Sequence, residues 1–144
     1  MLWGMTYLHG LITTALEKRS EFIETSKLEN TDAYRLFHGT NEGQAGLTVD
    51  RYGPQLLIQT FHKPLREGQE ADIVAACRSI FEPDEVIYND RSATNSRRED
   101  SEAIDSQEYS CQELGVNYLV QGKHRGQDPL LFLDFRSARR WVQT

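Results

Sequence analysis

A glycine-spaced loop is the first pattern in this sequence that could do chemistry. Gly39, Gly43 and Gly46 could let backbone N–H groups approach a phosphate group. The dinucleotide-binding pattern requires a strand before the glycines and a helix after them, and the phosphate-loop pattern ends in Lys-Ser or Lys-Thr. Here the glycines lead into a predicted strand, and no such lysine follows them. The pattern therefore favours a loop between two strands, in which the glycines accept positive φ angles.

The motif Asp134-Phe135-Arg136 is the second pattern. It follows the apolar run 130–133, which is expected to be buried. Charged side chains at the end of such a strand often face a functional site. The alternative is an N-cap aspartate followed by an arginine in the first turns of a helix, and the residues by themselves favour this alternative slightly.

Other charged residues have simpler explanations. Asp50 and Arg51 lie beside Gly53 at a predicted hairpin turn, where they are expected to form a surface ion pair that adds little stability. The two arginines at 97–98 are followed directly by acidic residues, which cancel their charge. This run is therefore interpreted as a solvated segment. No Ser-His-Asp or Cys-His catalytic set can be argued from the spacing, so no catalytic residue is assigned.

Composition excludes several classes of site. The net charge of −6 argues against a domain that binds nucleic acid mainly through phosphates, so any RNA contact requires a local basic patch or another part of the protein. Cys77, Cys111 and the four histidines have no metal-binding spacing, which predicts no metal site and two reduced thiols in a cytoplasmic protein. No apolar stretch reaches the roughly 18 residues of a membrane helix.

Hydrophobic periodicity predicts an α+β domain, with helices packed on one face of a small mixed or antiparallel sheet. An apolar stripe from Leu8 to Ile23 predicts a helix that runs to about Lys27, and helices are also predicted at about 70–81 and from 136 to 142. Strands are predicted at 34–37, 47–52, 55–61, 85–88, 116–121 and 130–133. Gly53-Pro54 predicts an antiparallel hairpin. The polar residues 89–110 predict either a mobile excursion or a poorly ordered hairpin.

Two stretches together resemble a known family. AYRLFHGTNEGQAGLTVDRYG, at 33–53, is similar to the Tyr-Arg-Leu, glycine-spaced loop and Gly-Leu-Thr-x-Asp-Arg hairpin of the large-subunit rRNA cytosine-C5 methyltransferase I type, which are class I S-adenosylmethionine (SAM)-dependent enzymes. GKHRGQDPLLFLDFRSARRWV, at 122–142, resembles the family's Gly-Gln and Leu-Asp-Gln-Arg segments. The resemblance covers about residue 10 to the end. Asp128-Pro129-Leu130 replaces the family's Lys-Thr-Gly and Phe135 replaces its Gln, which indicates a divergent subfamily.

The resemblance implies an order of domains. In that family an RNA-binding PUA domain precedes a small α+β central domain, and a Rossmann-like methyltransferase domain follows. It implies that residues 1–122 form the substrate-side domain and that 123–144 begin the methyltransferase domain. The glycine-rich cofactor loop is expected further downstream, because the sequence has no glycine after Gly126. The chain is therefore expected to be an N-terminal fragment that ends before a missing Rossmann-like domain and is inactive alone. SAM would bind the full-length protein only.

The resemblance also implies roles for particular residues. Gln127, Asp134 and Arg136 are expected near the amino-acid end of the cofactor or the incoming base. Arg35 and Arg51 are expected to contact phosphates of ribosomal RNA. Two alternatives remain, namely a stand-alone, non-catalytic RNA-binding module and a protein-interaction or homodimerisation module in which the edge of the hairpin pairs with a second subunit.

Overall fold

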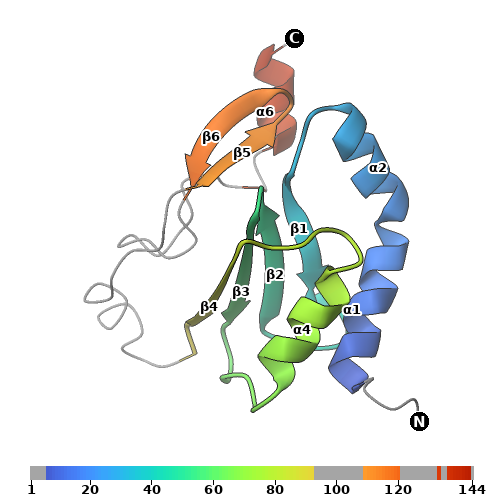
Figure 1. Ribbon diagram of the computed structural model, residues 1–144, viewed down its shortest axis with the longest axis vertical. Helices are drawn as coiled ribbons and strands as arrows, with labels where there is room; N and C mark the ends of the chain where they lie inside the picture. The colour runs from blue at the N-terminus through green and yellow to red at the C-terminus, as the bar shows by residue number, and fades with distance from the viewer. Residues whose placement is uncertain (1–5, 93–108, 121–132, 134–135, 144) are drawn as a thin grey trace.

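The computed structural model describes residues 6–92, 109–120, 133 and 136–143. Its helices and strands are α1 Tyr7–Lys18, α2 Ser20–Leu28, β1 Ala33–His38, α3 Gly39–Glu42, β2 Leu47–Tyr52, β3 Gln55–Thr60, α4 Gln69–Cys77, β4 Glu85–Asp90, β5 Tyr109–Glu113, β6 Val116–Val120 and α6 Arg136–Gln143. Figure 1 shows α1, α2 and α4 on one side of a central sheet and the β5–β6 hairpin above one end of it. None of the described helices is long and apolar enough to cross a membrane.

The central sheet is mixed, which is one of the two arrangements that the sequence predicts. Its order is β1-β2-β3-β4, in which β1–β2 and β2–β3 are antiparallel and β3–β4 is parallel. The predicted β2–β3 hairpin is confirmed, but it supplies the two central strands. The expectation that the edge of this hairpin pairs with a second subunit is therefore wrong, because both hairpin strands are already paired on both sides.

Two helix predictions need correction. The single helix expected to about Lys27 is two helices, α1 and α2, which meet at Arg19. The Arg19 guanidinium bonds to the Ala15 carbonyl oxygen (3.3 Å) and to both carboxylate oxygens of Glu42 (2.7 and 2.6 Å). The helix expected to reach residue 81 ends at Cys77, and a turn follows it.

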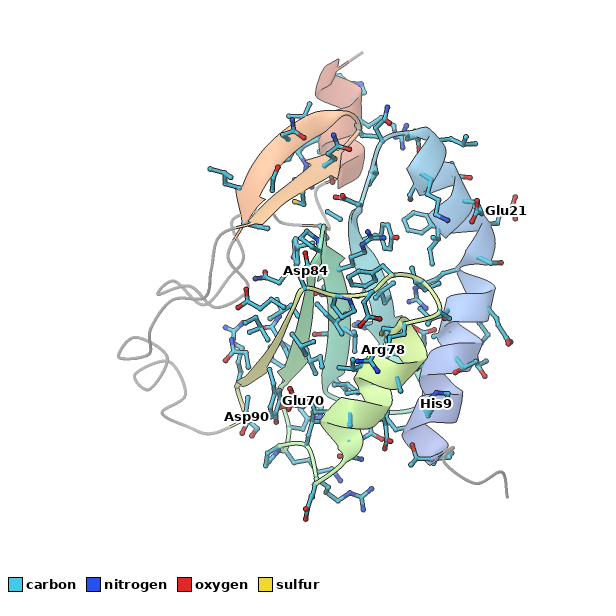
Figure 2. All side chains as sticks on the ribbon, in the orientation of Figure 1. His9, Glu21, Glu70, Arg78, Asp84 and Asp90 are labelled. Carbon is cyan, nitrogen blue, oxygen red and sulfur yellow. The ribbon has the colours of Figure 1, made fainter. Side chains whose placement is uncertain are left out.

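Three connections also differ from expectation. The glycine-spaced segment 39–46 contains the short helix α3, which Gly43 ends in a left-handed conformation (φ +108°). The strand predicted to stop at residue 88 continues to Asp90, which lies at the opposite end of β4 from Asp84 (Figure 2). The polar excursion is thus narrower than predicted, and residues 93–108 lie outside the described chain. Within the predicted strand 130–133 only Leu133 is described, in a 3-10 turn.

The larger core lies between the sheet and the helices. A β-bulge between Arg35 and Phe37 breaks the alternation of β1, so Leu36 and Phe37 are both fully buried. They pack in the main cluster with side chains from α1, α4 and the hairpin, which include Leu8, Ile12, Leu16, Val49, Leu56, Ile58, Ile73 and Cys77. This core confirms that the helices pack on one face of the sheet.

A second, smaller core covers one end of the opposite face. It contains Ala33, Tyr52, Leu57, Cys111 and Val120. The backbone and the side chain of Asp32 hold the β5–β6 hairpin there, because the Asp32 N–H bonds to the Gln112 carbonyl oxygen (2.9 Å) and the Gln112 N–H bonds to Asp32 Oδ1 (2.7 Å). The opposite face is therefore apolar at one end, whereas the residues at its other end are Thr48, Gln59 and Asn89, which are polar and buried.

The turn between β2 and β3 generates a prediction. Gly53 has φ +59°, and a Cβ atom there would lie 2.6 Å from the Ser110 carbonyl oxygen. Gly115 has φ +80° with nothing within 4 Å of a Cβ position. We expect Gly53→Ala to cost about 3 kcal/mol of unfolding free energy, through backbone strain and collision, and Gly115→Ala about 1 kcal/mol through strain alone. Urea denaturation measures both, and equal losses would contradict this packing of β5 on the turn.

The two cysteines generate another prediction. Burial raises the pKa of the Cys77 and Cys111 thiols to about 12. The thiolate is the reactive form of cysteine. We therefore expect both thiols of the folded protein to react with a chromogenic disulfide reagent at pH 8 only at the rate at which local or global unfolding exposes them. The same protein in urea should release two equivalents promptly. Rapid labelling of either thiol in the folded protein would show that its site is accessible.

Candidate functional site

The end of the second sheet face that lies away from the small core carries a row of polar side chains. Adjacent strands place His38 beside Thr48, Thr48 beside Gln59, and Gln59 beside Asn89. We call these four residues the polar row. Thr48, Gln59 and Asn89 are all buried, although a sheet face in a core is normally apolar. The row is therefore unusual enough to be a candidate site.

Two members of the polar row have unused hydrogen-bonding atoms. The Thr48 hydroxyl and both side-chain polar atoms of Asn89 are buried without a hydrogen-bond partner. Leaving such groups unpaired costs on the order of 1–3 kcal/mol each. Buried groups of this kind are ordinarily satisfied, so unpaired polar atoms on two strands of one sheet face call for an explanation beyond packing.

A charged pair lies next to the polar row. Arg35 donates to both carboxylate oxygens of Asp50, with Nε–Oδ1 at 2.7 Å and Nη2–Oδ2 at 3.2 Å. The Asp50 side chain is 3% exposed, whereas that of Arg35 is 42% exposed. Burial raises the pKa of Asp50, and the hydrogen bond from Arg35 opposes that rise. The expected surface pair of Asp50 with Arg51 is therefore wrong, because Asp50 is buried and bonds to Arg35.

The far edge of this face ends in an arginine and an aromatic ring. Arg91 follows β4, and its Nη1 lies 3.4 Å from Gln59 Oε1. The Arg91 guanidinium carbon lies 5.4 Å from the centre of the exposed Phe61 ring. Arginines and exposed aromatic rings beside amide side chains are features of surfaces that bind single-stranded nucleic acid.

Arg51, by contrast, lies on the helix side of the sheet and acts in packing. Its Nη1 donates to the Tyr34 hydroxyl (2.9 Å), and its Nε donates to the Gly53 carbonyl oxygen (2.8 Å). Its guanidinium carbon lies 4.2 Å from the centre of the Phe81 ring. These contacts use the donors that a phosphate would need, so the structure gives Arg51 a structural role and does not group it with Arg35.

The residues predicted to bind the cofactor are largely untested. Gln127 and Asp134 lie outside the described residues, and only the backbone of Arg136, the first residue of α6, is described. Two later arginines of α6 hold it to the body of the fold. Arg139 pairs with the buried Glu113, and Arg140 pairs with Glu29.

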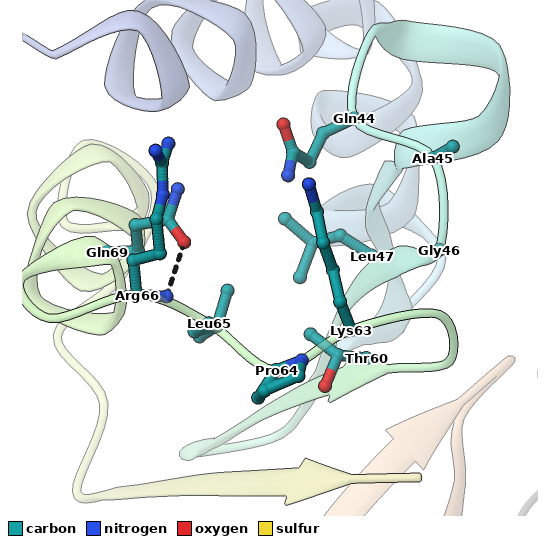
Figure 3. Close-up of a pocket in the computed structure, with 10 residues that line it drawn as sticks. All are labelled: Gln44, Ala45, Gly46, Leu47, Thr60, Lys63, Pro64, Leu65, Arg66 and Gln69. Carbon is teal, nitrogen blue, oxygen red and sulfur yellow. Dashed lines mark hydrogen bonds between the residues drawn. The ribbon is translucent and has the colours of Figure 1, made fainter. Parts of the chain in front are cut away.

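A cleft opens at the same end of the sheet, on the helix side. It has a volume of about 160 Å³ and is lined by Gln44, Ala45, Gly46, Leu47, Thr60, Lys63, Pro64, Leu65, Arg66 and Gln69. Figure 3 shows Lys63 and Gln44 on one side, Arg66 and Gln69 on the other, and Leu65 between them. The Arg66 N–H bonds to Gln69 Oε1 (2.7 Å), which fixes the start of α4 against the loop.

Sequence reasoning missed both of these features. Gln59 and Asn89 interrupt otherwise apolar strands, which is a signal that could have identified a polar face. Lys63 and Arg66 are two cations within four residues of a predicted loop. Their convergence on Gln44 depends on tertiary structure and has no signal in the sequence. Among the described residues, no group of His, Cys, Asp and Glu could hold a metal ion.

Comparison with known proteins finds relatives in sequence and in structure. No protein-family model matches it. Ribosomal RNA large subunit methyltransferase I of Salmonella paratyphi C is 32% identical over 130 residues, which is 82% of this chain and 32% of that protein. The protein of the same name from Shigella flexneri is 28% identical over 119 residues, 77% of this chain and 29% of that protein. The chain thus spans about a third of the length of the curated relatives it matches.

Solved structures share the fold. A protein from Streptococcus mutans assigned as a SAM-dependent methyltransferase matches with a TM-score of 0.71 and 24% identity, over 99% of this chain and 36% of that protein. SMU.776, assigned as a methyltransferase and crystallised with SAH, matches with a TM-score of 0.69 and 23% identity, over 94% of this chain and 34% of that protein. The arrangement of sheet and helices is therefore one that methyltransferase structures contain.

The Arg35–Asp50 pair generates a prediction about stability. Arg35→Ala leaves a buried carboxylate without its cation, so we expect a loss of about 2 kcal/mol at pH 7. Because the pKa of the unpaired Asp50 would then lie above its unfolded value, the folded variant binds the proton more tightly than the unfolded chain. The difference in unfolding free energy between the wild type and Arg35→Ala should therefore shrink as the pH falls from 7 towards 4. Urea denaturation at several pH values measures this effect.

A double variant supplies the control. Asp50→Asn removes the buried charge, so the pair Arg35→Ala/Asp50→Asn should recover most of the stability lost in Arg35→Ala and remove its pH dependence. If the double variant is as unstable as the two single losses added together, the two side chains do not act as a pair.

Proposed function

We propose that this chain is the substrate-side part of a SAM-dependent RNA methyltransferase, in which it positions RNA beside a cofactor-binding portion that these residues do not form. The match to ribosomal RNA large subunit methyltransferase I, over 82% of this chain and about a third of that protein, carries the proposal. The shared fold with two proteins assigned as methyltransferases supports it.

The described residues do not fit a SAM site of the Rossmann type. Such a site needs a glycine-rich turn from a strand into a helix, where backbone N–H groups approach the ligand. In the part of the chain that the structure describes, Gly39 follows β1 but opens only the four-residue helix α3, and Gly43 and Gly46 lead into β2. Only Gly68 lies between β3 and α4. SAM would supply the methyl group when bound, and we assign its binding to the remainder of an enzyme of the relatives' length.

On this proposal the second sheet face forms one wall of the substrate cleft. Its polar row offers unpaired donor and acceptor atoms at Thr48 and Asn89, which are groups suited to the edges of bases. Arg35 stands at the rim with part of its side chain exposed, and Arg91 and Phe61 lie at the far edge. A wall of this composition selects for polar, aromatic ligands such as unstacked nucleotides.

A methyl-transfer assay tests the proposal. Protein isolated from the source cells with an antibody to this chain should transfer radiolabelled methyl groups from SAM to ribosomal RNA, whereas the recombinant 144-residue chain should not. Transfer by the recombinant chain would show that catalysis resides in these residues. Absence of transfer by the isolated protein, with RNA still crosslinked to it, would favour the stand-alone RNA-binding alternative.

Cofactor binding is tested separately. We expect titration of the recombinant chain with SAH to give no heat of binding, because no described element offers the required turn. A dissociation constant below about 100 μM, which corresponds to roughly −5.5 kcal/mol, would place a cofactor site within this chain.

A further inference from the structure

Two cations of the cleft differ from most of the basic side chains that the structure describes, because neither has an acceptor. Ion pairs with carboxylates engage Arg19, Lys27, Arg35, Arg78, Arg139 and Arg140. Arg51 and Arg91 contact aromatic rings and hydrogen-bond acceptors, and Lys18 lies in the electrostatic range of Glu42. Within the described chain, the side chains of Lys63 and Arg66 have neither an ion pair nor a hydrogen bond.

The surroundings of these two cations suit an anion. None of the residues that line the cleft is acidic, although the whole chain carries a net charge of −6. Gln44 and Gln69 add neutral amide groups, and Leu65 lies between the two sides. A volume of about 160 Å³ has room for a phosphate group, since one water occupies roughly 30 Å³.

Glu67 is exposed and follows Arg66 in the chain, so it offsets part of the positive charge near the cleft, whereas other nearby acidic groups have interactions of their own. Asp90 accepts hydrogen bonds from the Thr60 hydroxyl (2.9 Å) and from the Ser92 N–H (3.0 Å) and hydroxyl (2.5 Å). Glu70 and Asp72 lie in the first turn of α4 and offset the positive end of that helix. The attraction for an anion therefore comes from Lys63 and Arg66 themselves.

We propose that the Lys63–Arg66 cleft binds a phosphodiester group of the RNA backbone, in an inference that rests on the proposed function. The cleft and the polar row lie at the same end of the sheet, because the Leu47–Thr60 pair of the cleft is next in register to the Thr48–Gln59 pair of the row. Because the cleft opens on the helix side and the row on the opposite face, a strand whose bases meet the row would pass around this end of the sheet to bring its backbone to the cleft. The phosphate contact fixes register, and the polar row contacts bases.

Salt dependence of RNA binding tests the inference. A labelled single-stranded oligoribonucleotide of about 20 nucleotides is titrated with the 144-residue chain from 50 to 200 mM KCl, with fluorescence anisotropy as the readout. The variant Lys63→Ala/Arg66→Ala should lose one or two phosphate contacts. Its plot of log affinity against log salt concentration should therefore have a slope shallower by about 1 than that of the wild type. The affinity of this variant at 50 mM KCl should fall about tenfold.

Two matched variants isolate the cleft from general charge. Lys18→Ala/Arg78→Ala removes the same charge at exposed positions outside the cleft, and Figure 2 shows Arg78 at the opposite end of α4 from Glu70. This variant should keep the wild-type slope. The charge-conserving Lys63→Arg/Arg66→Lys should also keep it. Circular dichroism confirms that each variant is folded.

The outcomes separate the two proposals. If the wild-type chain binds RNA and the alanine variant keeps the wild-type slope, the cleft inference is overturned while RNA positioning stands. If the wild-type chain does not bind RNA over this salt range, RNA positioning by these residues fails as well.

Sodium pyrophosphate is a further probe. If millimolar pyrophosphate competes with RNA for the wild type and not for the alanine variant, the result supports phosphate binding in the cleft. Tight, saturable pyrophosphate binding without RNA binding would mean that the cleft takes a free phosphate and would overturn the phosphodiester assignment.

Discussion

Burial of both faces of the β2–β3 hairpin is the constraint on which the rest of the structure depends. Every residue of β3 is buried, so its alternate side chains need a partner layer on each side. Leu56 and Ile58 face the helices, and Leu57 faces the β5–β6 hairpin. Because a lone hairpin cannot bury two faces, the helices and β5–β6 are both required to complete it.

The two ends of the second sheet face differ in polarity. The β5–β6 hairpin closes one end with apolar contacts, and the polar row occupies the other. The same strands therefore supply a stable core and a face with hydrogen-bonding capacity. An enzyme of the relatives' length could use this division, since its substrate wall would be held rigid by the core directly behind it. The acidic net charge is compatible with such a role, because two cations that the described contacts leave without an acceptor lie together in one cleft.

Charge pairing explains how an acidic chain can still present a basic site. Most of the described arginines form ion pairs within the chain. Arg19 links the end of α1 to α3, and Arg139 links α6 to β5. Pairs that are partly buried hold their partners more firmly than exposed ones. The cations that can bind a ligand are those that the fold leaves without a partner. The composition of the chain does not tell how many there are.

The sequence by itself determined the β2–β3 hairpin and the helical layer, because period and turn residues act over short distances. It left open whether the sheet is mixed or antiparallel, and the parallel pairing of β3 with β4 decided that. The sequence also carried the family resemblance on the 33–53 stretch. Only the tertiary structure decided that the hairpin is central, that Asp50 pairs with Arg35, and that Arg51 packs against Phe81. Each of these features depends on which distant segment of the chain packs against the residue or strand concerned. The free energy that favours this packing is shared among many contacts, which no local sequence pattern encodes.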